Sequence, residues 1–126
     1  MGYLVDSNVL IDYVAERFTQ AQLKTLDLIF DEALRVSVIT KIEILGHNGV
    51  PQEDERMLEF LNYADILKLS ESVVERTILL KKSIKMKTPD AIIASTALVY
   101  GFTLITNNVA DFKRVEDLKF FNPYEL

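Results

Sequence analysis

Length, composition and charge exclude several classes of protein before any residue is placed. The chain has 126 residues, 49% of them hydrophobic, and we expect residues 1–126 to form one domain with its own core. It has no cysteine, which excludes disulfides, thiolate metal sites and cysteine nucleophiles. A net charge of −5 argues against binding nucleic acid by broad phosphate neutralisation alone. The N-terminal residues carry no basic segment and no long apolar run, so we expect a cytoplasmic protein without a membrane span.

The first part of the chain alternates short apolar runs with helical spacing. Residues 3–5 are closed by Asp6-Ser7-Asn8, which predicts a strand, a turn and the start of a helix. Residues 23–34 carry one apolar stripe and predict a second helix, which leads into a brief strand at residues 35–38. Thr40 or Ser37 is the expected cap of the next helix.

Glycine and proline interrupt this pattern at residues 46–51. Helical spacing resumes at residues 52–63, so we expect a helical hairpin arm here. The only histidine, His47, lies in the interruption, and we interpret it as an exposed loop residue rather than a ligand.

A strand and a capped helix are predicted next. Residues 66–69 are the strand candidate. Ser72 and Glu75 form a capping-box pattern for a helix that should end near Lys85. Four lysines crowd the end of this helix: Lys81, Lys82, Lys85 and Lys87. They could form a basic rim that receives phosphate, or simply a solvated helix end.

The last part of the chain predicts a buried helix and two strands. Residues 88–90 read as a cap, a proline and an acid at the start of a helix that Gly101 ends. Residues 102–106 are a buried strand, residues 107–112 a loop and residues 118–121 a last strand. Because strands alternate with helices, the sequence predicts a three-layer α/β/α fold with a short central parallel sheet.

Four acidic residues lie at predicted turns between elements. Asp6 ends the first strand and Asp111 follows the strand at residues 102–106, whereas Glu43 lies in the first turns of the helix after the second strand and Asp90 starts the buried helix. The carboxyl ends of parallel strands meet at one edge of a sheet, so we expect these side chains to converge. Converging carboxylates without counter-charge would raise one another's pKa and cost stability, and a bound cation removes that penalty. Mg²⁺ or Mn²⁺ suits oxygen ligands, and such cations can activate water for phosphoryl chemistry.

Each acid also has a structural explanation. Asp6 could cap the first helix, Asp90 is favoured in a first helical turn by the helix dipole, and Asp111 could belong to a polar loop. Glu43 is the most informative, because it is an acid amid Ile42 and Ile44.

Four ordered segments carry a family resemblance. They are Leu4-Val5-Asp6-Ser7-Asn8-Val9-Leu10-Ile11-Asp12, Ser37-Val38-Ile39-Thr40-Lys41-Ile42-Glu43-Ile44-Leu45-Gly46, Pro89-Asp90-Ala91-Ile92-Ile93-Ala94 and Leu104-Ile105-Thr106-Asn107-Asn108-Val109-Ala110-Asp111-Phe112, followed by Asn122-Pro123. Together they span essentially the whole chain. In this order they resemble the PIN domain, specifically the compact VapC-type toxins of bacterial and archaeal toxin–antitoxin pairs.

The resemblance implies both a site and an activity. It implies that the four acids are catalytic metal ligands, with polar support from Asn8, Thr40, Thr106 and Asn108. Asn8 and Thr40 could equally act only as helix caps. It further implies an endoribonuclease dependent on Mg²⁺ or Mn²⁺ that hydrolyses RNA with metal-activated water, a homodimer, and a cognate antitoxin. Many relatives have aspartate at the position of Asn108, and an amide brings no charge, so a second metal should bind weakly or only with substrate.

Other functions fit the residues less well or remain open. A haloacid-dehalogenase-like phosphatase needs Asp-x-Asp after its first strand, where this chain has Asp6-Ser7-Asn8. A phosphoreceiver domain needs a phosphorylatable aspartate at the end of its third strand, but Asp65 comes before the predicted third strand of this chain. A PIN nuclease that processes RNA without being a toxin, and a catalytically silent PIN-fold interaction module, remain alternatives.

Overall fold

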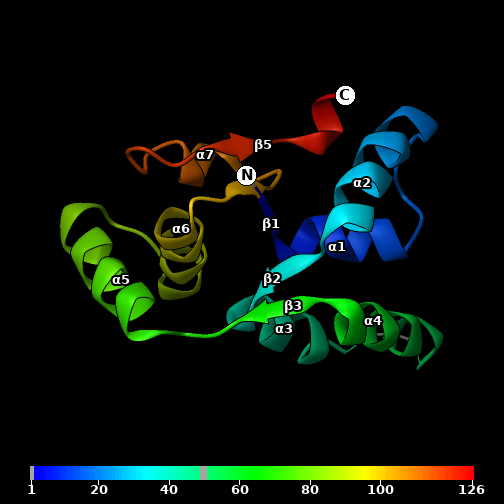
Figure 1. Cartoon of the computed structure of the whole chain (residues 1–126), viewed down its shortest axis with the longest axis horizontal. Coiled ribbons are helices and arrows are strands. Elements are labelled where there is room, and N and C mark those ends of the chain that lie inside the picture. Colours follow the sequence, from blue (N-terminus) through cyan, green and yellow to red (C-terminus); the bar gives the residue numbers. More distant parts are fainter. Residues whose placement is uncertain (1, 49–50) are drawn as a thin grey trace.

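The computed structural model describes residues 2–48 and 51–126, which form helices around short parallel strands (Figure 1). In chain order the elements are β1 (Tyr3–Val5), α1 (Ser7–Val14), α2 (Gln20–Glu32), β2 (Arg35–Ser37), α3 (Val38–Leu45), α4 (Pro51–Tyr63), β3 (Asp65–Leu67), α5 (Glu71–Ser83), α6 (Thr88–Tyr100), β4 (Thr103–Ile105), α7 (Val109–Phe112), β5 (Phe120–Phe121) and a 3-10 turn at Pro123–Glu125. None of the helices in this part of the chain has both the length and the apolar composition that crossing a bilayer needs.

All strand pairs are parallel, as predicted from the alternation of strands and helices. They form two small sheets: β4 lies between β1 and β5, and β2 pairs with β3. β1 and β2 contact each other where the two sheets meet. In the larger sheet Val5 lies opposite Ile105, so β1 and β4 end at the same edge. The residues that follow these strands are therefore neighbours.

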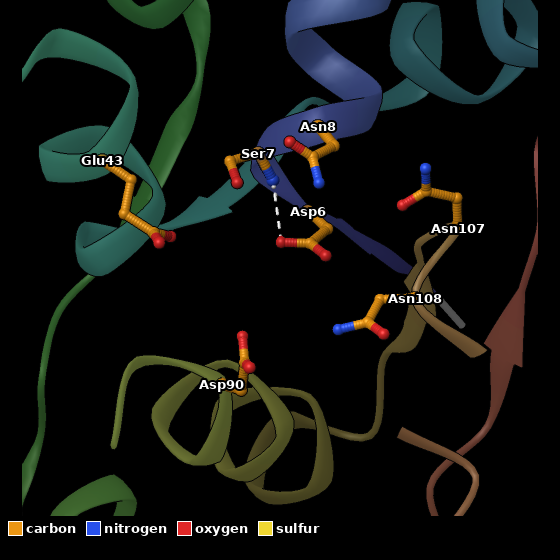
Figure 2. A pocket seen from close by; sticks show the side chains of 7 residues that line it. All are labelled: Asp6, Ser7, Asn8, Glu43, Asp90, Asn107 and Asn108. Atoms are coloured by element: carbon orange, nitrogen blue, oxygen red, sulfur yellow. Dashed lines mark hydrogen bonds between the residues drawn. The ribbon is translucent and has the colours of Figure 1, made fainter. Parts of the chain in front are cut away.

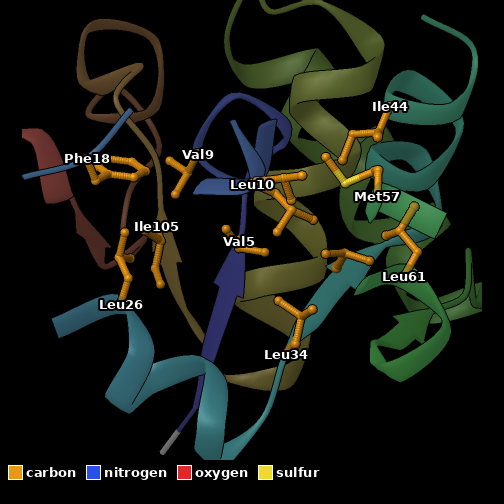
Figure 3. Packing of buried hydrophobic residues seen from close by; sticks show 12 residues of the cluster. Val5, Val9, Leu10, Phe18, Leu26, Leu34, Ile44, Met57, Leu61 and Ile105 are labelled. Atoms are coloured by element: carbon orange, nitrogen blue, oxygen red, sulfur yellow. The ribbon is translucent and has the colours of Figure 1, made fainter. Parts of the chain in front are cut away.

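The sheet lies between two hydrophobic clusters, and successive side chains of β1 and β4 point alternately into one or the other. Val5 and Ile105 belong to a cluster that α1 and α2 complete on one face, shown in Figure 3. Leu4 and Leu104 belong to a second cluster, which α6 completes on the other face. This alternation follows from the two-residue period of a strand. The predicted order of helix, sheet and helix is confirmed, and it holds the strand ends rigidly from both sides.

Short polar side chains start most of the helices. Asp6 caps α1 by accepting a hydrogen bond from the Ser7 amide, and Ser37, not Thr40, caps α3. Gly101 ends α6 at a φ of 72°, a left-handed conformation that glycine adopts without strain.

The start of α5 differs from its prediction. Ser70 caps the helix by accepting from the Val73 amide, so the capping box predicted at Ser72 and Glu75 was wrong. Val73 and Thr77 lie one turn apart on the buried face of the helix that Ser70 caps.

Other boundaries moved by a few residues. α5 ends at Ser83 instead of near Lys85, because Ile84 turns to an extended conformation. Thr88 lies inside α6, and Lys87 occupies the cap position without a side-chain hydrogen bond. The loop predicted at residues 107–112 contains α7, whose last residue, Phe112, is fully buried.

Candidate active site

An open cavity of about 450 Å³ lies at the carboxyl edge of β1 and β4. Acids, amides and one hydroxyl line it: Asp6, Ser7, Asn8, Glu43, Asp90, Asn107 and Asn108. Figure 2 shows that the side chains of Asp6, Glu43 and Asp90 point toward a shared space from three separate elements. Three of the four predicted acids are thus brought to one cavity by the fold.

Asp6 is the most buried of these acids, with 6% of its surface exposed. One carboxylate oxygen accepts from the Ser7 amide at 2.8 Å, and the other accepts from the Thr106 hydroxyl at 2.8 Å. The Thr106 hydroxyl oxygen in turn accepts a hydrogen bond from the backbone amide of Asn108 at 3.0 Å. Burial raises the pKa of Asp6, and the bonds from Thr106 and Ser7 oppose that rise. This chain of hydrogen bonds fixes the direction in which Asp6 faces.

Glu43 and Asp90 are the other two acids that line this cavity, which we call the acidic cavity. Partial burial raises the pKa of the Glu43 carboxyl, and the charges of Asp6 and Asp90 add to the effect. Burial likewise raises the pKa of Asp90, Asp6 and Asp111 raise it further, and Lys87 opposes the rise. Asp6 and Asp90 therefore act on Glu43 across the cavity, and Asp6 and Asp111 act on Asp90, which is the repulsion between carboxylates that the sequence predicted.

We expect Glu43→Gln to stabilise the protein in EDTA at pH 7 by roughly 0.5–1 kcal/mol after allowance for solvent screening, or about 2–4 °C in Tm. A raised carboxyl pKa means that the folded state binds the proton more tightly than the unfolded chain does. The charged form therefore opposes folding at pH 7, and this cost disappears as the pH falls through the raised pKa.

Thermal unfolding of wild type and Glu43→Gln at pH 7 and pH 4 tests this expectation, and the difference in Tm should close at pH 4. Glu59→Gln is the matched control, because Glu59 is an exposed glutamate in the second half of α4, outside the cavity. An equal gain in Glu59→Gln, or a gap independent of pH, would show that the acidic cavity is not the cause.

Asp111 occupies a different position from the other three acids. It lines a neighbouring cavity that shares Asp90 with the first. Its carboxylate accepts from the Asn108 side-chain amide at 3.0 Å and lies 4.0 Å from the Arg114 guanidinium. The fourth predicted acid is therefore at the edge of the acidic cavity, partly neutralised by an arginine.

The predicted supporting residues divide in the same way. Asn8 and Asn108 line the cavity, and Thr106 is buried behind Asp6. Thr40 is fully buried on α3, and its hydroxyl has no hydrogen-bond partner within the described residues. His47 is exposed and lines none of the cavities described here, as interpreted from the sequence.

Two lining residues were not among the predicted site residues. Ser7 follows Asp6 directly, and Asn107 follows Thr106, so both lie just beyond a strand end. Their position after a strand was the signal that could have identified them.

The donor set of this cavity fits a hard divalent cation. Every side-chain ligand that it offers is an oxygen of a carboxylate, amide or hydroxyl. No lysine or arginine in residues 2–48 and 51–126 forms an ion pair with Asp6, Glu43 or Asp90. In that same part of the chain, no three acidic or histidine side chains are close enough to form a closed metal-binding group. The arrangement is an open group of acids without an ion-pair partner in the described residues, and Lys87 acts on Asp90 only from a distance.

Comparisons with known proteins agree with this fold. The family model described as PIN domain matches residues 3–118. Ribonuclease VapC1 of Rickettsia felis is 28% identical over 130 residues, covering 94% of each chain, and Ribonuclease VapC of Rickettsia bellii is 27% identical over the same coverage. A toxin–antitoxin complex from Klebsiella pneumoniae superposes with a TM-score of 0.78 at 28% identity, over 99% of this chain and 100% of that one. VapBC2 of Rickettsia felis bound to promoter DNA has a TM-score of 0.80 at 23% identity, over 97% and 98%.

Fold and site together define a small α/β domain with an acid-lined cavity at the carboxyl edge of its parallel strands. The chain belongs to the PIN-domain family.

Proposed function

We propose that this protein is a metal-dependent endoribonuclease and the toxin of a type II toxin–antitoxin pair, acting in the cytoplasm as a single domain. The observation that carries the proposal is the convergence of three carboxylates without a partner cation in a PIN-domain chain. Two similar proteins carry the name ribonuclease, and similar solved structures are toxin–antitoxin complexes. A nuclease that works with hard cations needs such an oxygen-lined, incompletely filled site.

The residues that would hold Mg²⁺ or Mn²⁺ are Asp6, Glu43 and Asp90, with Asp111 and Asn108 at the edge. When bound, the cation supplies the means to activate water and to neutralise charge during hydrolysis of an RNA phosphodiester bond. Thr106 keeps Asp6 oriented through its 2.8 Å hydrogen bond. Glu43 is the most exposed of the three principal acids.

The side-chain amides of the cavity have a separate task in this proposal. Asn8 and Asn107 are exposed on its rim and carry neutral N–H donors. Such donors can bind phosphate oxygens without competing with the carboxylates for a cation. They would orient the scissile phosphate beside the acids.

A homodimer and a cognate antitoxin are the protein partners that we propose. Large apolar side chains on α3 and α4 are exposed: Ile42, Leu45 and Leu58. Exposed apolar surface of this kind is typical of protein interfaces. The similar structure from Klebsiella pneumoniae is a toxin–antitoxin complex, which supports the antitoxin partner.

The proposal is tested with purified protein and a labelled RNA. Cleavage should be at least about tenfold faster with Mn²⁺ or Mg²⁺ than in EDTA, because the acids repel both one another and the phosphate until a cation enters. Activity should return when the chelated protein is given Mn²⁺ again. Cleavage that persists in EDTA would contradict the proposal.

A catalytically silent PIN module is the second candidate, favoured by one observation. Asn108 brings an amide instead of a charge to the edge of the site, and it binds Asp111. Absence of RNA cleavage with every divalent cation, in a protein that still binds its partner, would support that candidate instead.

A further inference from the structure

A second cavity, of about 470 Å³, adjoins the acidic one. We call it the basic groove. Four cations, two acids and one methionine line it: Lys81, Lys85, Lys87, Arg114, Asp90, Asp111 and Met86. Asp90 also lines the acidic cavity, so the two share a wall. The lysines come from the end of α5 and the connection to α6, and Arg114 follows α7.

The positive charge of this groove is concentrated in an otherwise acidic protein with a net charge of −5. Lys85 and Lys87 are exposed, and neither forms an ion pair within residues 2–48 and 51–126. The four cations of the lining outnumber its two carboxylates, so the groove keeps an excess of positive charge that a bound anion would neutralise. Lys87 already acts on the acidic cavity, since its charge opposes the rise in the pKa of Asp90.

Lys81 has a structural role in the same groove. Its ammonium group donates to the Met86 carbonyl at 3.0 Å and to the Thr88 hydroxyl at 3.1 Å. These bonds tie the end of α5 to the start of α6. The backbone that carries Lys85 and Lys87 is thereby held in place beside Asp90.

We propose that the basic groove binds backbone phosphates of the RNA strand whose scissile bond lies in the acidic cavity, with Lys85 and Lys87 as the principal contacts. This inference rests on the ribonuclease function proposed above. Because Asp90 separates the two cavities, a strand that leaves the acidic cavity passes directly into the groove. The described lining has no aromatic side chain on which a base could stack, so the groove recognises the phosphate backbone rather than base identity.

The test compares Lys85→Ala/Lys87→Ala with Lys82→Ala. Lys82 is an exposed lysine at the same helix end that does not line the groove, so it controls for the general loss of positive charge. RNA cleavage kinetics should show a higher KM for the double variant. Lys85→Ala alone leaves Lys87 in place beside Asp90, so it should raise KM with kcat close to that of wild type. Both lysines are exposed, and the Tm should not change.

Binding is measured separately, by fluorescence anisotropy of a labelled single-stranded RNA of mixed sequence, in an Asp6→Asn background that prevents cleavage. Each lost phosphate contact should lower the slope of log K against log salt by about 0.7, which corresponds to about fivefold weaker binding at 0.1 M salt. The double variant should therefore bind about 25-fold more weakly. Lys82→Ala should stay within about twofold, because it loses no contact. Lys85→Gln and Lys87→Gln, which keep much of each side chain, should each give one such step.

The outcomes separate this inference from the proposed function. Wild-type protein that neither binds nor cleaves RNA would overturn both. Wild-type cleavage with a double variant indistinguishable from Lys82→Ala would overturn the basic groove alone. A double variant that no longer binds a polyglutamate peptide bound by the wild type, but binds RNA as the wild type does, would also overturn it. That result would assign the groove to an acidic protein segment.

Discussion

Asp6→Asn is expected to lower kcat for RNA cleavage by on the order of 10³ without disturbing the fold. A metal centre contributes several kcal/mol to transition-state stabilisation, and about 4 kcal/mol corresponds to this factor. Two hydrogen bonds fix the orientation of the Asp6 carboxylate at the end of β1. An amide in its place keeps the size but removes the charge that would hold the cation.

The fold should survive this substitution for reasons visible in the structure. Asparagine caps helices as well as aspartate does, so its oxygen can still accept from the Ser7 amide. Its NH₂ group would face the Thr106 hydroxyl oxygen, which has a second lone pair besides the one bound to the Asn108 amide. Removing a buried charge whose pKa is raised also relieves a cost at neutral pH.

Initial rates with saturating Mn²⁺, combined with thermal unfolding, measure this expectation. Asp65→Asn is the control, since Asp65 is an exposed aspartate of β3 outside the cavity and should keep full activity. Retention of activity within tenfold in Asp6→Asn, at an unchanged Tm, would remove Asp6 from the proposed site.

The place of Asp6 could be predicted because it follows from topology: Asp6 comes directly after β1. Parallel strands end at one edge of a sheet whatever the loops do, so a residue placed just after a strand in the sequence is also placed in space. Glu43 lies within α3 and Asp90 in the first turn of α6, which follows α5 and not a strand. Their closeness to Asp6 therefore also depends on how α3 and α6 pack on each other.

The split between two sheets and the place of Asp111 depend on longer-range contacts that a local pattern does not contain. β2 pairs with β3 and only contacts β1 without a shared ladder, which depends on the packing of several helices at once. Asp111 was predicted in a loop, but burial of its neighbour Phe112 winds α7 and turns the acid toward Arg114. A lysine-rich helix end was visible in the sequence, whereas its closeness to Asp90 depends on how α5 packs on α6.

Phe112→Ala is expected to destabilise the protein by about 3–5 kcal/mol, a lowering of Tm on the order of 10–20 °C. Phe112 is fully buried between α7 and the core cluster that contains Leu4 and Leu104. Its removal leaves a cavity in that core cluster, in addition to the lost transfer free energy. With a total stability of about 5–15 kcal/mol, the variant would lose a large part of its reserve.

The same substitution should also reduce RNA cleavage at temperatures well below the Tm of the variant. The reason is that α7 carries Asp111, and Asn108, whose side chain donates a hydrogen bond to Asp111, occupies the cap position of α7. Phe120→Ala is the matched control: Phe120 is 37% exposed on β5, so truncation should cost much less, on the order of 1 kcal/mol. Urea unfolding of both variants provides their free energies of unfolding, and cleavage rates at low temperature show whether the site is disturbed while the chain is still folded.

Equal losses of stability in the two variants would mean that Phe112 does not anchor α7. A destabilised Phe112→Ala with wild-type cleavage at low temperature would instead show that Asp111 contributes little to the reaction.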